Sequence, residues 1–407
     1  MIELACIVLA AAGAVGNGTA GSAGPDKTFG LQETVCEDLN PADYWNAKEL
    51  FKVPSYRANP YPESEFPGMK ALLVKGKGPD NSEAEFFAYY GHPEGRTPKG
   101  GWPGVVLVHG GGGTAYPQYV QRWVKGGFAV IALDWYNRRP AMGLTNVPPT
   151  EVSVPRVDLP GGRRQDHIAN VANMVLSHSL LRSFPEVNAG RTVYVGLSWG
   201  SWYGSCVAAV DDRFKGGCMI YLADRLNGAS KDIKSAGFVK GHFHKSVKIP
   251  LWWIAFPKDS NGTPHSLNAG WLACPKYDGA TIVHDLGHSH SGFNLAAVKR
   301  MADYFTGSAK HLPKLSFGRI EGRQAIADVL DPGMGLEKAI LWYTTDKDAT
   351  SLRPAVSRKA KWQSSPAKIV GRRVVADIPA DARIVYLSAY EKRYTMCGSS
   401  AFLFVTH

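Results

Sequence analysis

This chain of 407 residues has few cysteines and no long hydrophobic run. Its six cysteines are widely spaced and none stands in a C-x-x-C pair, which argues against a disulfide framework, a thiol redox centre or a cysteine-based zinc site. No apolar stretch reaches the roughly 18 residues of a membrane-spanning helix, so we expect no stable membrane insertion. We also expect neither a metal nor an organic cofactor.

The chain lacks a dense tract of Lys and Arg interleaved with aromatic residues, although its formal net charge is +11. More than half of this excess lies in residues 311–407, which hold 15 Lys and Arg against 9 Asp and Glu. A positive balance suits an acidic polymer, an anionic surface or simple solubility. Without the basic and aromatic tract, we expect no nucleic-acid partner.

The first 24 residues contain a short apolar run, Ala5 to Val15, followed by small residues. Such a run is too short to span a bilayer but suits the core of a signal peptide, and Gly21-Ser22-Ala23 is an acceptable cleavage site. The usual basic residues before the core are absent, and Glu3 stands there instead, as it would if the start were misassigned. We predict a signal peptide at 1–24 and a secreted or periplasmic protein.

Three further segments follow. Residues 25–67 are rich in Pro, Asn and Tyr and are predicted to be irregular. In residues 68–310, continuous apolar runs alternate with helical stretches, which predicts a doubly wound, mostly parallel sheet covered by helices on both faces. In residues 311–407, alternating runs follow one another without helices, which predicts a β-sandwich of immunoglobulin-like type that serves as structural support or for substrate docking. The predicted fold class is therefore α/β with a C-terminal all-β module.

Individual elements follow from the same patterns. The strands expected in the α/β part are Met69–Lys75, Glu83–Tyr90, Val105–Val108, Phe128–Leu133, Thr192–Val195, Gly217–Leu222, Pro250–Phe256 and Ala280–His284. The helices expected are Gln118–Lys125, Asp166–Leu181, Ser201–Val210 and Leu295–Phe305. The runs expected in the C-terminal module are Ala339–Thr344, Lys368–Ile378 and Arg383–Tyr390.

The most informative motif is Gly196-Leu197-Ser198-Trp199-Gly200, which lies between an expected strand and an expected helix. A strand that turns sharply into a helix exposes the central serine on a strained turn, and its flanking positions must be glycine because strand and helix approach closely there. Ser198 is therefore the candidate nucleophile.

A serine hydroxyl needs a base, and the base needs an orienting acid. Asp259 follows the expected strand at 250–256, and His288 follows the expected strand at 280–284. The order serine, acid, histidine at successive strand ends suits this chemistry. His290 is the second choice for the base, and His284 is expected to be a core residue or one that supports the site without touching the substrate. Histidine pairs at 288/290 and 242/244 also have metal-ligand spacing, but no acidic or cysteine ligands accompany them.

Four glycines follow His109 at the end of an expected strand. They allow backbone N–H groups to face a developing oxyanion, and we predict donors from Gly110, Gly111 and Trp199. The loop lacks the Gly-Lys-Ser/Thr ending of a phosphate loop. His109 is expected to be a structural hydrogen-bonding residue.

Aromatic residues flank these motifs. Tyr116 and Trp202 are predicted to line a substrate pocket, together with His290, although core packing is an equal alternative for Trp202. Asp166 is expected to begin a helix as its N-terminal residue.

Together these motifs resemble the serine α/β-hydrolases, in the branch of acetylxylan esterases, dienelactone-hydrolase-like proteins and prolyl-oligopeptidase-type catalytic domains. The resemblance covers about Met69 to Gly307 and rests on Val108 to Thr114, Gly196 to Gly200, Asp211 to Phe214, Asp259 and Gly287-His288. It implies an α/β-hydrolase fold and a small appended β-sandwich. Dienelactone hydrolases use a cysteine nucleophile, so the serine here argues against their chemistry.

The leading hypothesis is a secreted serine carboxylic-ester hydrolase that deacetylates carbohydrate, with a small-molecule or polysaccharide ester as its partner. One alternative is a prolyl-oligopeptidase-type peptidase, although only about 70 residues precede the hydrolase strands, too few for two propeller blades. The other is a non-catalytic surface-binding protein with a hydrolase-like domain. The acyl group, the polymer and the oligomeric state are left open.

Overall fold

The computed structural model describes residues 27–29, 37–141, 154–159, 166–223, 241–391 and 396–406. The predicted signal peptide at 1–24 lies outside these residues. Within the described ranges, no helix combines the length and the apolar character that a membrane crossing needs.

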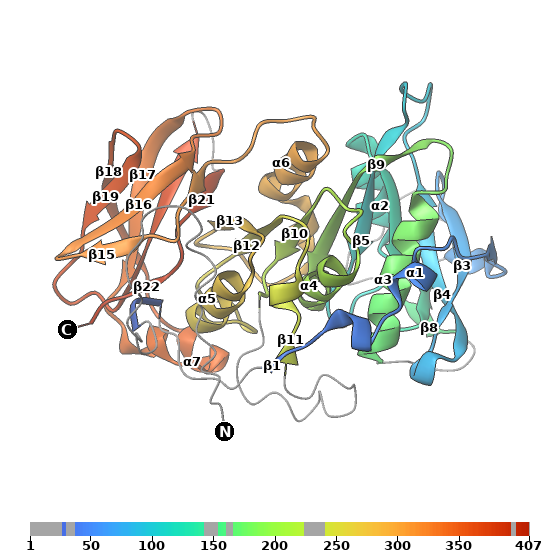
Figure 1. The fold of residues 1–407 in the computed structure, drawn as a ribbon, viewed down its shortest axis with the longest axis horizontal. Coiled ribbons are helices and arrows are strands. Elements are labelled where there is room, and N and C mark those ends of the chain that lie inside the picture. The colour runs from blue at the N-terminus through green and yellow to red at the C-terminus, as the bar shows by residue number, and fades with distance from the viewer. Residues whose placement is uncertain are drawn as a thin grey trace.

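A central sheet organises the α/β part (Figure 1). Its hydrogen-bonded strand order is β2-β3-β4-β6-β5-β9-β10-β12-β13. The bounds are β2 Tyr56–Ala58, β3 Lys70–Lys77, β4 Glu83–Gly91, β5 Trp102–Val108, β6 Ala129–Leu133, β9 Val187–Leu197, β10 Gly216–Ile220, β12 Leu251–Ala255 and β13 Tyr277–Ile282. The strands from β6 to β13 are parallel, and β2, β3 and β4 are antiparallel. The predicted fold class is confirmed.

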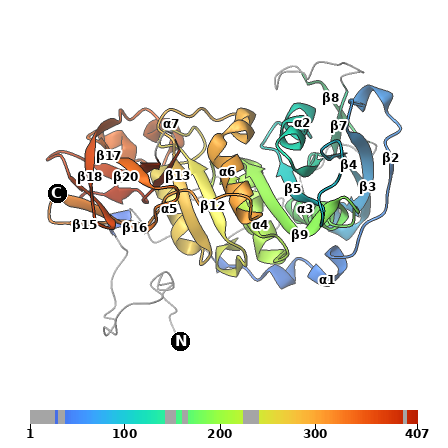
Figure 2. The ribbon, with the colours of Figure 1, turned by 90° about the horizontal axis from the view of Figure 1, so that it is seen from above.

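Helices cover both faces of this sheet, as Figure 2 shows. The helices are α1 Ala47–Leu50, α2 Pro117–Lys125, α3 His167–Leu181, α4 Trp199–Val210, α5 Pro264–Ala273, α6 Ala296–Phe305 and α7 Pro354–Ser357. Side chains of α2 and α6 belong to one core cluster, and those of α3, α4 and α5 belong to the other. Burial on both faces explains why β5, β6 and β12 are continuous apolar runs.

Polar caps begin two of these helices. The Asp166 side chain accepts a hydrogen bond from the Ala169 N–H at 2.8 Å, as expected for a helix N-cap. Helix α5 was not predicted, although Thr263 and Ser266 form a capping box at its start.

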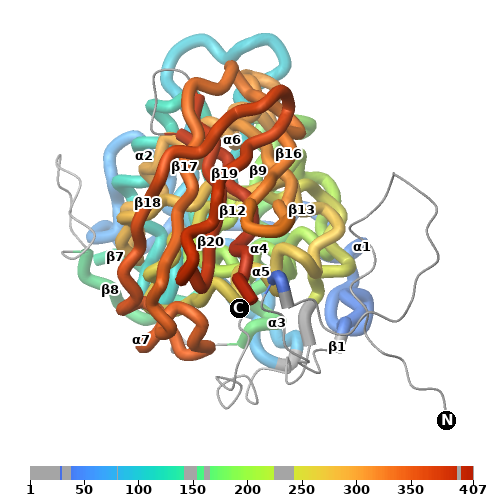
Figure 3. Tube along the Cα trace, turned by 90° about the vertical axis from the view of Figure 1, so that its left-hand side faces the viewer, coloured from blue at the N-terminus to red at the C-terminus, as the bar shows by residue number. Residues whose placement is uncertain are grey.

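The C-terminal strands form two antiparallel ladders around a third core cluster (Figure 3). Their bounds are β14 Lys314–Leu315, β15 Arg319–Glu321, β16 Gln324–Asp331, β17 Leu336–Thr344, β18 Gln363–Val370, β19 Arg373–Asp377, β20 Ile384–Glu391, β21 Cys397–Ser399 and β22 Leu403–Phe404. The run Lys368–Ile378, expected as one strand, is instead a hairpin. Its turn contains Gly371 at φ +59°, a conformation that suits glycine.

The C-terminal module is joined to the central sheet by strand pairing. Ala280 of β13 pairs antiparallel with Ser399 of β21, and the Thr281 hydroxyl donates to the Cys397 carbonyl at 2.6 Å. The module therefore extends the same hydrogen-bonded sheet, a connection that the sequence patterns did not predict.

The segment 25–67 is not wholly irregular, which corrects the sequence-based expectation. Its strand β2 adds an antiparallel edge to β3, and β1 (Glu37–Asp38) pairs in parallel with β11 (Gly241–His242). The short lengths of these strands leave little periodicity for sequence analysis to detect.

Candidate active site

Ser198 occupies the turn between β9 and α4 with φ +56° and ψ −114°, a conformation that non-glycine residues rarely adopt. Its N–H donates to the Ile220 carbonyl of the neighbouring strand at 2.8 Å. The residue is 7% exposed. Residues held in strained conformations cluster at functional sites, because the surrounding fold must over-determine them.

The glycines on either side of this serine are required by close approach. A Cβ atom on Gly196 would lie 2.1 Å from the Gly200 carbonyl oxygen. A Cβ atom on Gly200 would lie 2.2 Å from the carbonyl oxygen of Val108 at the end of β5. Because backbone blocks both positions, larger side chains would displace the strand or the helix.

Three polar side chains from separate strand ends are hydrogen-bonded in series. The Nε2 atom of His288 lies 2.8 Å from the Ser198 Oγ, and its Nδ1 lies 2.8 Å from one carboxylate oxygen of Asp259. Asp259 is 2% exposed and also accepts the Asn261 N–H at 2.8 Å. With Nδ1–H donating to the carboxylate, the imidazole presents an unprotonated Nε2 to the serine hydroxyl. Such a series lets the imidazole take the hydroxyl proton as the oxygen attacks an electrophile.

Tyr221 supports His288, and sequence analysis missed it. The two rings stack with centroids 4.4 Å apart and an interplanar angle of 28°. The Tyr221 hydroxyl lies 2.9 Å from the carbonyl oxygens of both Gly287 and Ser289. Tyr221 also has φ +81°, at the position that follows β10. A tyrosine after an apolar strand is typical of a core residue, so only the fold brings it to the histidine.

Most N–H groups of the glycine loop after β5 already donate hydrogen bonds to other atoms of the protein. The Gly110 N–H donates to His290 Nε2 at 3.0 Å, the Gly112 N–H to the Tyr136 hydroxyl at 3.3 Å, and the Gly113 N–H to the Gly110 carbonyl at 3.1 Å. Within the described residues, the Gly111 N–H makes no hydrogen bond. The Gly110 contact differs from the expectation that this amide faces an oxyanion.

The peptide unit between Gly110 and Gly111 is held by its carbonyl. His109 lies with Nδ1 2.7 Å from the Gly110 oxygen, and its Nε2 accepts the Trp135 N–H at 3.3 Å. Because a trans peptide points its N–H opposite to its C=O, this contact also directs the Gly111 N–H. Burial lowers the pKa of His109, which favours the neutral tautomer that donates from Nδ1. His109 is thus a hydrogen-bonding residue, as predicted.

Two arginines hold the next carbonyls of this loop. Arg138 of β7 (Arg138–Pro140) donates to the Gly113 carbonyl, and Arg156 of β8 (Arg156–Asp158) donates to the Gly112 carbonyl. The two strands pair antiparallel. The loop is therefore fixed through its carbonyls as well as its amides.

The residues predicted to line a substrate pocket are mostly buried. Tyr116 is 4% exposed and packs on the ring of His290 at 4.8 Å. Trp202 is 6% exposed and packs edge-on against Trp199 at 5.7 Å. His290 is 8% exposed and holds the glycine loop. These three side chains are part of the buried packing around the site, whereas Trp199 keeps partial exposure beside Gly111.

A cavity of about 430 Å³ opens beside His288. It is lined by Phe256, Lys258, Ser260, Asp285, Leu286, Gly287, His288 and Arg358. Arg358 comes from the C-terminal module, where it directly follows α7. The sequence offered no signal for this approach, because 100 positions separate it from Lys258.

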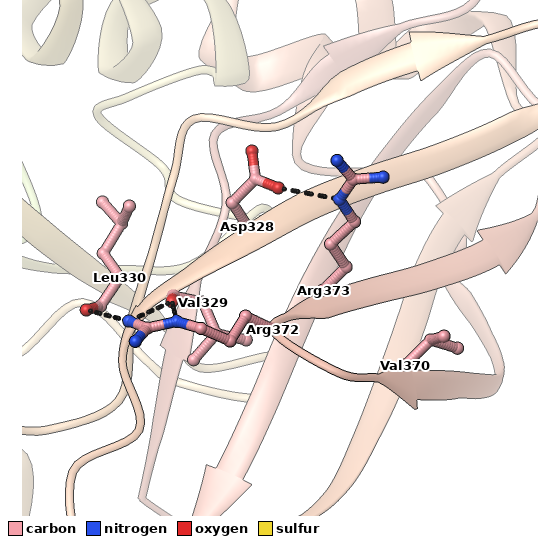
Figure 4. Close-up of a pocket in the computed structure, with 6 residues that line it drawn as sticks. All are labelled: Asp328, Val329, Leu330, Val370, Arg372 and Arg373. Carbon is pink, nitrogen blue, oxygen red and sulfur yellow. Dashed lines mark hydrogen bonds and ion pairs between the residues drawn. The ribbon is translucent and has the colours of Figure 1, made fainter. Parts of the chain in front are cut away.

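A second cavity, of about 590 Å³, lies on the C-terminal module (Figure 4). Its lining residues are Asp328, Val329, Leu330, Val370, Arg372 and Arg373. Both arginines are engaged there: Arg372 donates to the carbonyls of Val329 and Leu330, and Arg373 pairs with Asp328 at 3.3 Å. None of the three residues hydrogen-bonded in series contributes to it.

The other histidines and cysteines have structural surroundings. His284 lies two positions past the end of β13, keeps partial exposure and stacks on Trp342 at 4.3 Å. Cys206, Cys218, Cys274 and Cys397 are buried and free of disulfides. In the part of the chain that the structure describes, no group of three or more His, Cys, Asp or Glu side chains could hold a metal. The side chain of His242 lies outside that part.

His178 of α3 and Asp211, which directly follows α4, form a buried pair. Nδ1 of His178 lies 2.8 Å from Asp211, whose carboxylate also binds the Arg213 guanidinium at 2.7 Å. Burial lowers the pKa of His178 to about 4. Burial opposes ionisation of Asp211, but the hydrogen bonds from Arg213 and His178 outweigh it and lower the pKa of this carboxyl. The pair fixes local structure, as the family resemblance implied for Asp211 to Phe214.

Comparison with known families gives one match. The model of the alpha/beta hydrolase family matches residues 105–381, which include Ser198, Asp259 and His288. No curated protein sequence is matched by this chain.

Several solved structures are similar. The acetyl xylan esterase from Paenibacillus sp. R4 is 19% identical, covers 69% of this chain and 99% of its own, and has a TM-score of 0.47. Acetyl xylan esterase 1 from Thermoanaerobacterium sp. JW/SL YS485 is 16% identical over 69% of this chain and 96% of its own, with a TM-score of 0.44. The Pyrococcus horikoshii acylaminoacyl peptidase is 16% identical over 59% of this chain and 42% of its own, with a TM-score of 0.41. These similarities carry no inference about substrate.

Proposed function

The chain belongs to the alpha/beta hydrolase family, and from this premise we propose that it is a serine ester hydrolase that removes acetyl or similar small acyl groups from carbohydrate. The observation that carries the proposal is the hydrogen-bonded series from Ser198 through His288 to Asp259. A nucleophile, a base and an orienting acid in contact are the parts that acyl transfer needs.

The proposed reaction has two halves. The Ser198 oxygen attacks the ester carbonyl carbon while His288 Nε2 takes the hydroxyl proton, and Asp259 stabilises the resulting imidazolium. His288 then gives this proton to the departing alcohol, which leaves an acyl group on the serine. A water molecule, deprotonated by the same imidazole, attacks the acyl-enzyme, and the imidazolium then returns this proton to the Ser198 oxygen as the carboxylic acid leaves.

The tetrahedral intermediates of both halves carry a negative oxygen that needs backbone donors. The N–H of Gly111 and the N–H of Trp199 are the proposed donors. Gly111 adjoins the indole of Trp199, and the glycine at position 110 packs directly on Ser198, where an added Cβ would meet the Ser198 Cβ at 2.9 Å. Trp199 directly follows Ser198 and begins α4, and the N-terminal end of a helix favours a negative charge. The signal-like sequence at 1–24 supports the further proposal that this reaction takes place outside the cytoplasm.

The proposal is tested with p-nitrophenyl acetate, acetylated xylan and a dipeptidyl p-nitroanilide. We expect the first two to be hydrolysed and the third to be spared. Ser198→Ala should abolish ester hydrolysis and labelling by a fluorophosphonate, while Ser55→Ala provides a matched control at an exposed serine that directly precedes the edge strand β2. Near-full activity of the Ser198→Ala variant, or preferential cleavage of the anilide, would overturn the proposal.

A further inference from the structure

We propose that Arg358 binds a negatively charged group on the alcohol portion of the substrate, so that the preferred ester is one of an acidic carbohydrate. This proposal rests on the proposed function, because it assigns a substrate class to the same site. Its basis is that Arg358, a residue of the C-terminal module, lines the cavity beside His288.

The cavity adjoins His288, the residue that would give its proton to the departing alcohol. It is bordered by the loop that contains Gly287 and His288, and by Phe256 and Lys258 at the end of β12. Ser198 and the two proposed oxyanion donors, Gly111 and Trp199, come from other segments and do not line this cavity. Because His288 gives its proton to the departing alcohol, the alcohol portion must lie against this imidazole. We therefore place the alcohol portion of the substrate in the cavity that His288 lines.

The position of Arg358 is fixed by contacts between the two parts of the fold. The 3-10 turn Lys347–Thr350 is bound to α5, since His265 Nε2 lies 2.9 Å from the Thr350 carbonyl. The Ser357 hydroxyl at the end of α7 donates to the Ala349 carbonyl of the same turn at 3.2 Å. The backbone of Arg358 is thus held against the catalytic part, and only the exposed side chain needs to be ordered by a ligand.

Of the charged residues that line the cavity, Lys258 and Asp285 form an ion pair, which leaves the positive charge of Arg358. Lys258 pairs with Asp285 at 3.0 Å, so these two groups offset one another. The Lys258 hydrogen bond lowers the pKa of Asp285, which keeps that carboxylate ionised. Arg358 forms no ion pair or hydrogen bond through its side chain within the described residues. This contrasts with the arginines of the cavity in Figure 4, whose guanidinium groups are already engaged.

The chain around Arg358 adds to this positive field. Residues 349–376 contain no Asp or Glu. They contain Arg353, Arg358, Lys359, Lys361, Lys368, Arg372 and Arg373. Arg358 is the residue of this basic segment that lines the cavity, and a segment of one charge sign raises the local concentration of a polyanion. A guanidinium also matches a carboxylate with two parallel hydrogen bonds, which a lysine does not offer.

The test compares acetate release from three mono-O-acetylated methyl galactopyranosides. The first has a free hydroxymethyl group, the second has a carboxylate in its place, and the third has the hydroxymethyl group sulfated. We expect kcat/KM for the carboxylate ester to exceed that for the neutral ester by about 5- to 20-fold, because an exposed charge-assisted pair retains part of its strength. Arg358→Gln should remove this ratio, and Arg358→Glu should invert it. A larger increase in kcat/KM for the sulfated substrate than for the carboxylate substrate would identify sulfate as the recognised anion.

Arg96→Gln serves as the matched control, because Arg96 is an exposed arginine before β5, at the opposite end of the strands from His288. It should leave the ratio unchanged. An equal preference for neutral and charged esters in the wild type, or an unchanged ratio in Arg358→Gln, would overturn the proposal while leaving the ester hydrolase intact.

Binding measurements test the anion contact even if no ester is cleaved. Calorimetry with the Ser198→Ala variant measures the Kd of methyl galacturonoside and of its neutral galactoside counterpart. The proposal predicts that the uronoside binds more tightly than the galactoside. It also predicts that this difference is lost when Arg358→Gln is added to Ser198→Ala. Equal affinities for the two sugars contradict it, and inactivity toward all three esters counts separately against the proposed function.

Discussion

The imidazole of His290 accepts a hydrogen bond from the Gly110 N–H, with 3.0 Å between the two nitrogens. Both partners are buried beneath the site, and a Cβ on Gly110 would lie 2.9 Å from the Cβ of Ser198. The two histidines of the 288–290 loop therefore act at different places. His288 faces the serine hydroxyl, whereas His290 fixes the first residue of the glycine loop.

Replacing His290 with Leu should lower kcat for p-nitrophenyl acetate by about 10- to 30-fold, with KM changed by less than about threefold. The loss is smaller than the roughly 100-fold cost of deleting an oxyanion donor, because the loop is displaced and not removed. His290→Gln should recover part of kcat, since its amide oxygen can accept the Gly110 N–H. A variant with unchanged kcat, or a defect confined to KM, would contradict this positioning role.

Asp259→Asn should reduce kcat/KM by about 10³- to 10⁴-fold, because the amide can stabilise the wrong imidazole tautomer and offers no charge to the imidazolium. The esterase assay gives the rate, and circular dichroism checks that the fold is retained. Asp212→Asn is the control, since Asp212 is an exposed aspartate that does not belong to the series of Ser198, His288 and Asp259. Equal losses in both variants would point to a general effect on folding.

Tyr221→Phe should slow fluorophosphonate labelling of Ser198 by about tenfold. The ring still stacks on His288, but the loop loses the hydroxyl that contacts the Gly287 and Ser289 carbonyls. The expected cost in stability is about 1 kcal/mol, typical of one hydrogen bond. Labelling kinetics and urea denaturation separate the two effects. Unchanged labelling would show that stacking alone holds the imidazole.

Gly196→Ala should destabilise the fold by at least about 3 kcal/mol, because its Cβ would meet the Gly200 carbonyl at 2.1 Å and backbone cannot yield there. Gly287→Ala is the matched control. A Cβ at Gly287 meets nothing within 4 Å, so its effect on unfolding free energy should stay within about 0.5 kcal/mol. Thermal and urea denaturation measure both. Comparable stabilities would contradict the close packing of strand and helix.

Acid should destabilise the protein through His178. Burial lowers its folded-state pKa to about 4, whereas an unfolded histidine titrates near about 6.5. The unfolded chain therefore binds the proton more readily, so stability is complete above about pH 6.5 and is lost as the pH falls toward 4. We expect this residue to contribute a loss of about 2–3 kcal/mol over that window.

Urea denaturation between pH 7 and pH 4.5 measures this dependence. His178→Gln should be less stable at pH 7, because the Asp211 carboxylate loses its imidazole partner, and its stability should vary less with pH. A variant that keeps the full wild-type pH dependence would assign the effect to other groups.

Local patterns were sufficient for most of the α/β part. The apolar runs that became β5, β6 and β12 are buried on both faces, and burial of that kind leaves a continuous hydrophobic signature. The missed elements are those without such a signature. Helix α5 has little amphipathic contrast because most of its residues are buried, and β2 is only three residues long.

Long-range packing decided the rest of the candidate site. Asp259 and His288 are 29 positions apart and Ser198 is 90 positions from His288, yet strand ends at one edge of a parallel sheet bring them into contact. The choice between His288 and His290 depended on which ring faces the serine hydroxyl. The sequence favoured His288 because it follows Gly287 just after an expected strand, and the structure places the ring of His288 at the serine hydroxyl.

The sequence by itself determined the elbow at Ser198, the glycine loop and the order of the acid and the histidine, because each depends on residue types within or beside one strand. The tertiary structure alone decided that His290 binds the Gly110 amide, that Tyr221 stacks on His288, and that Arg358 lines the cavity beside it. These contacts join residues far apart in the chain, and their geometry exists only when the sheet, its helices and the C-terminal strands are packed together.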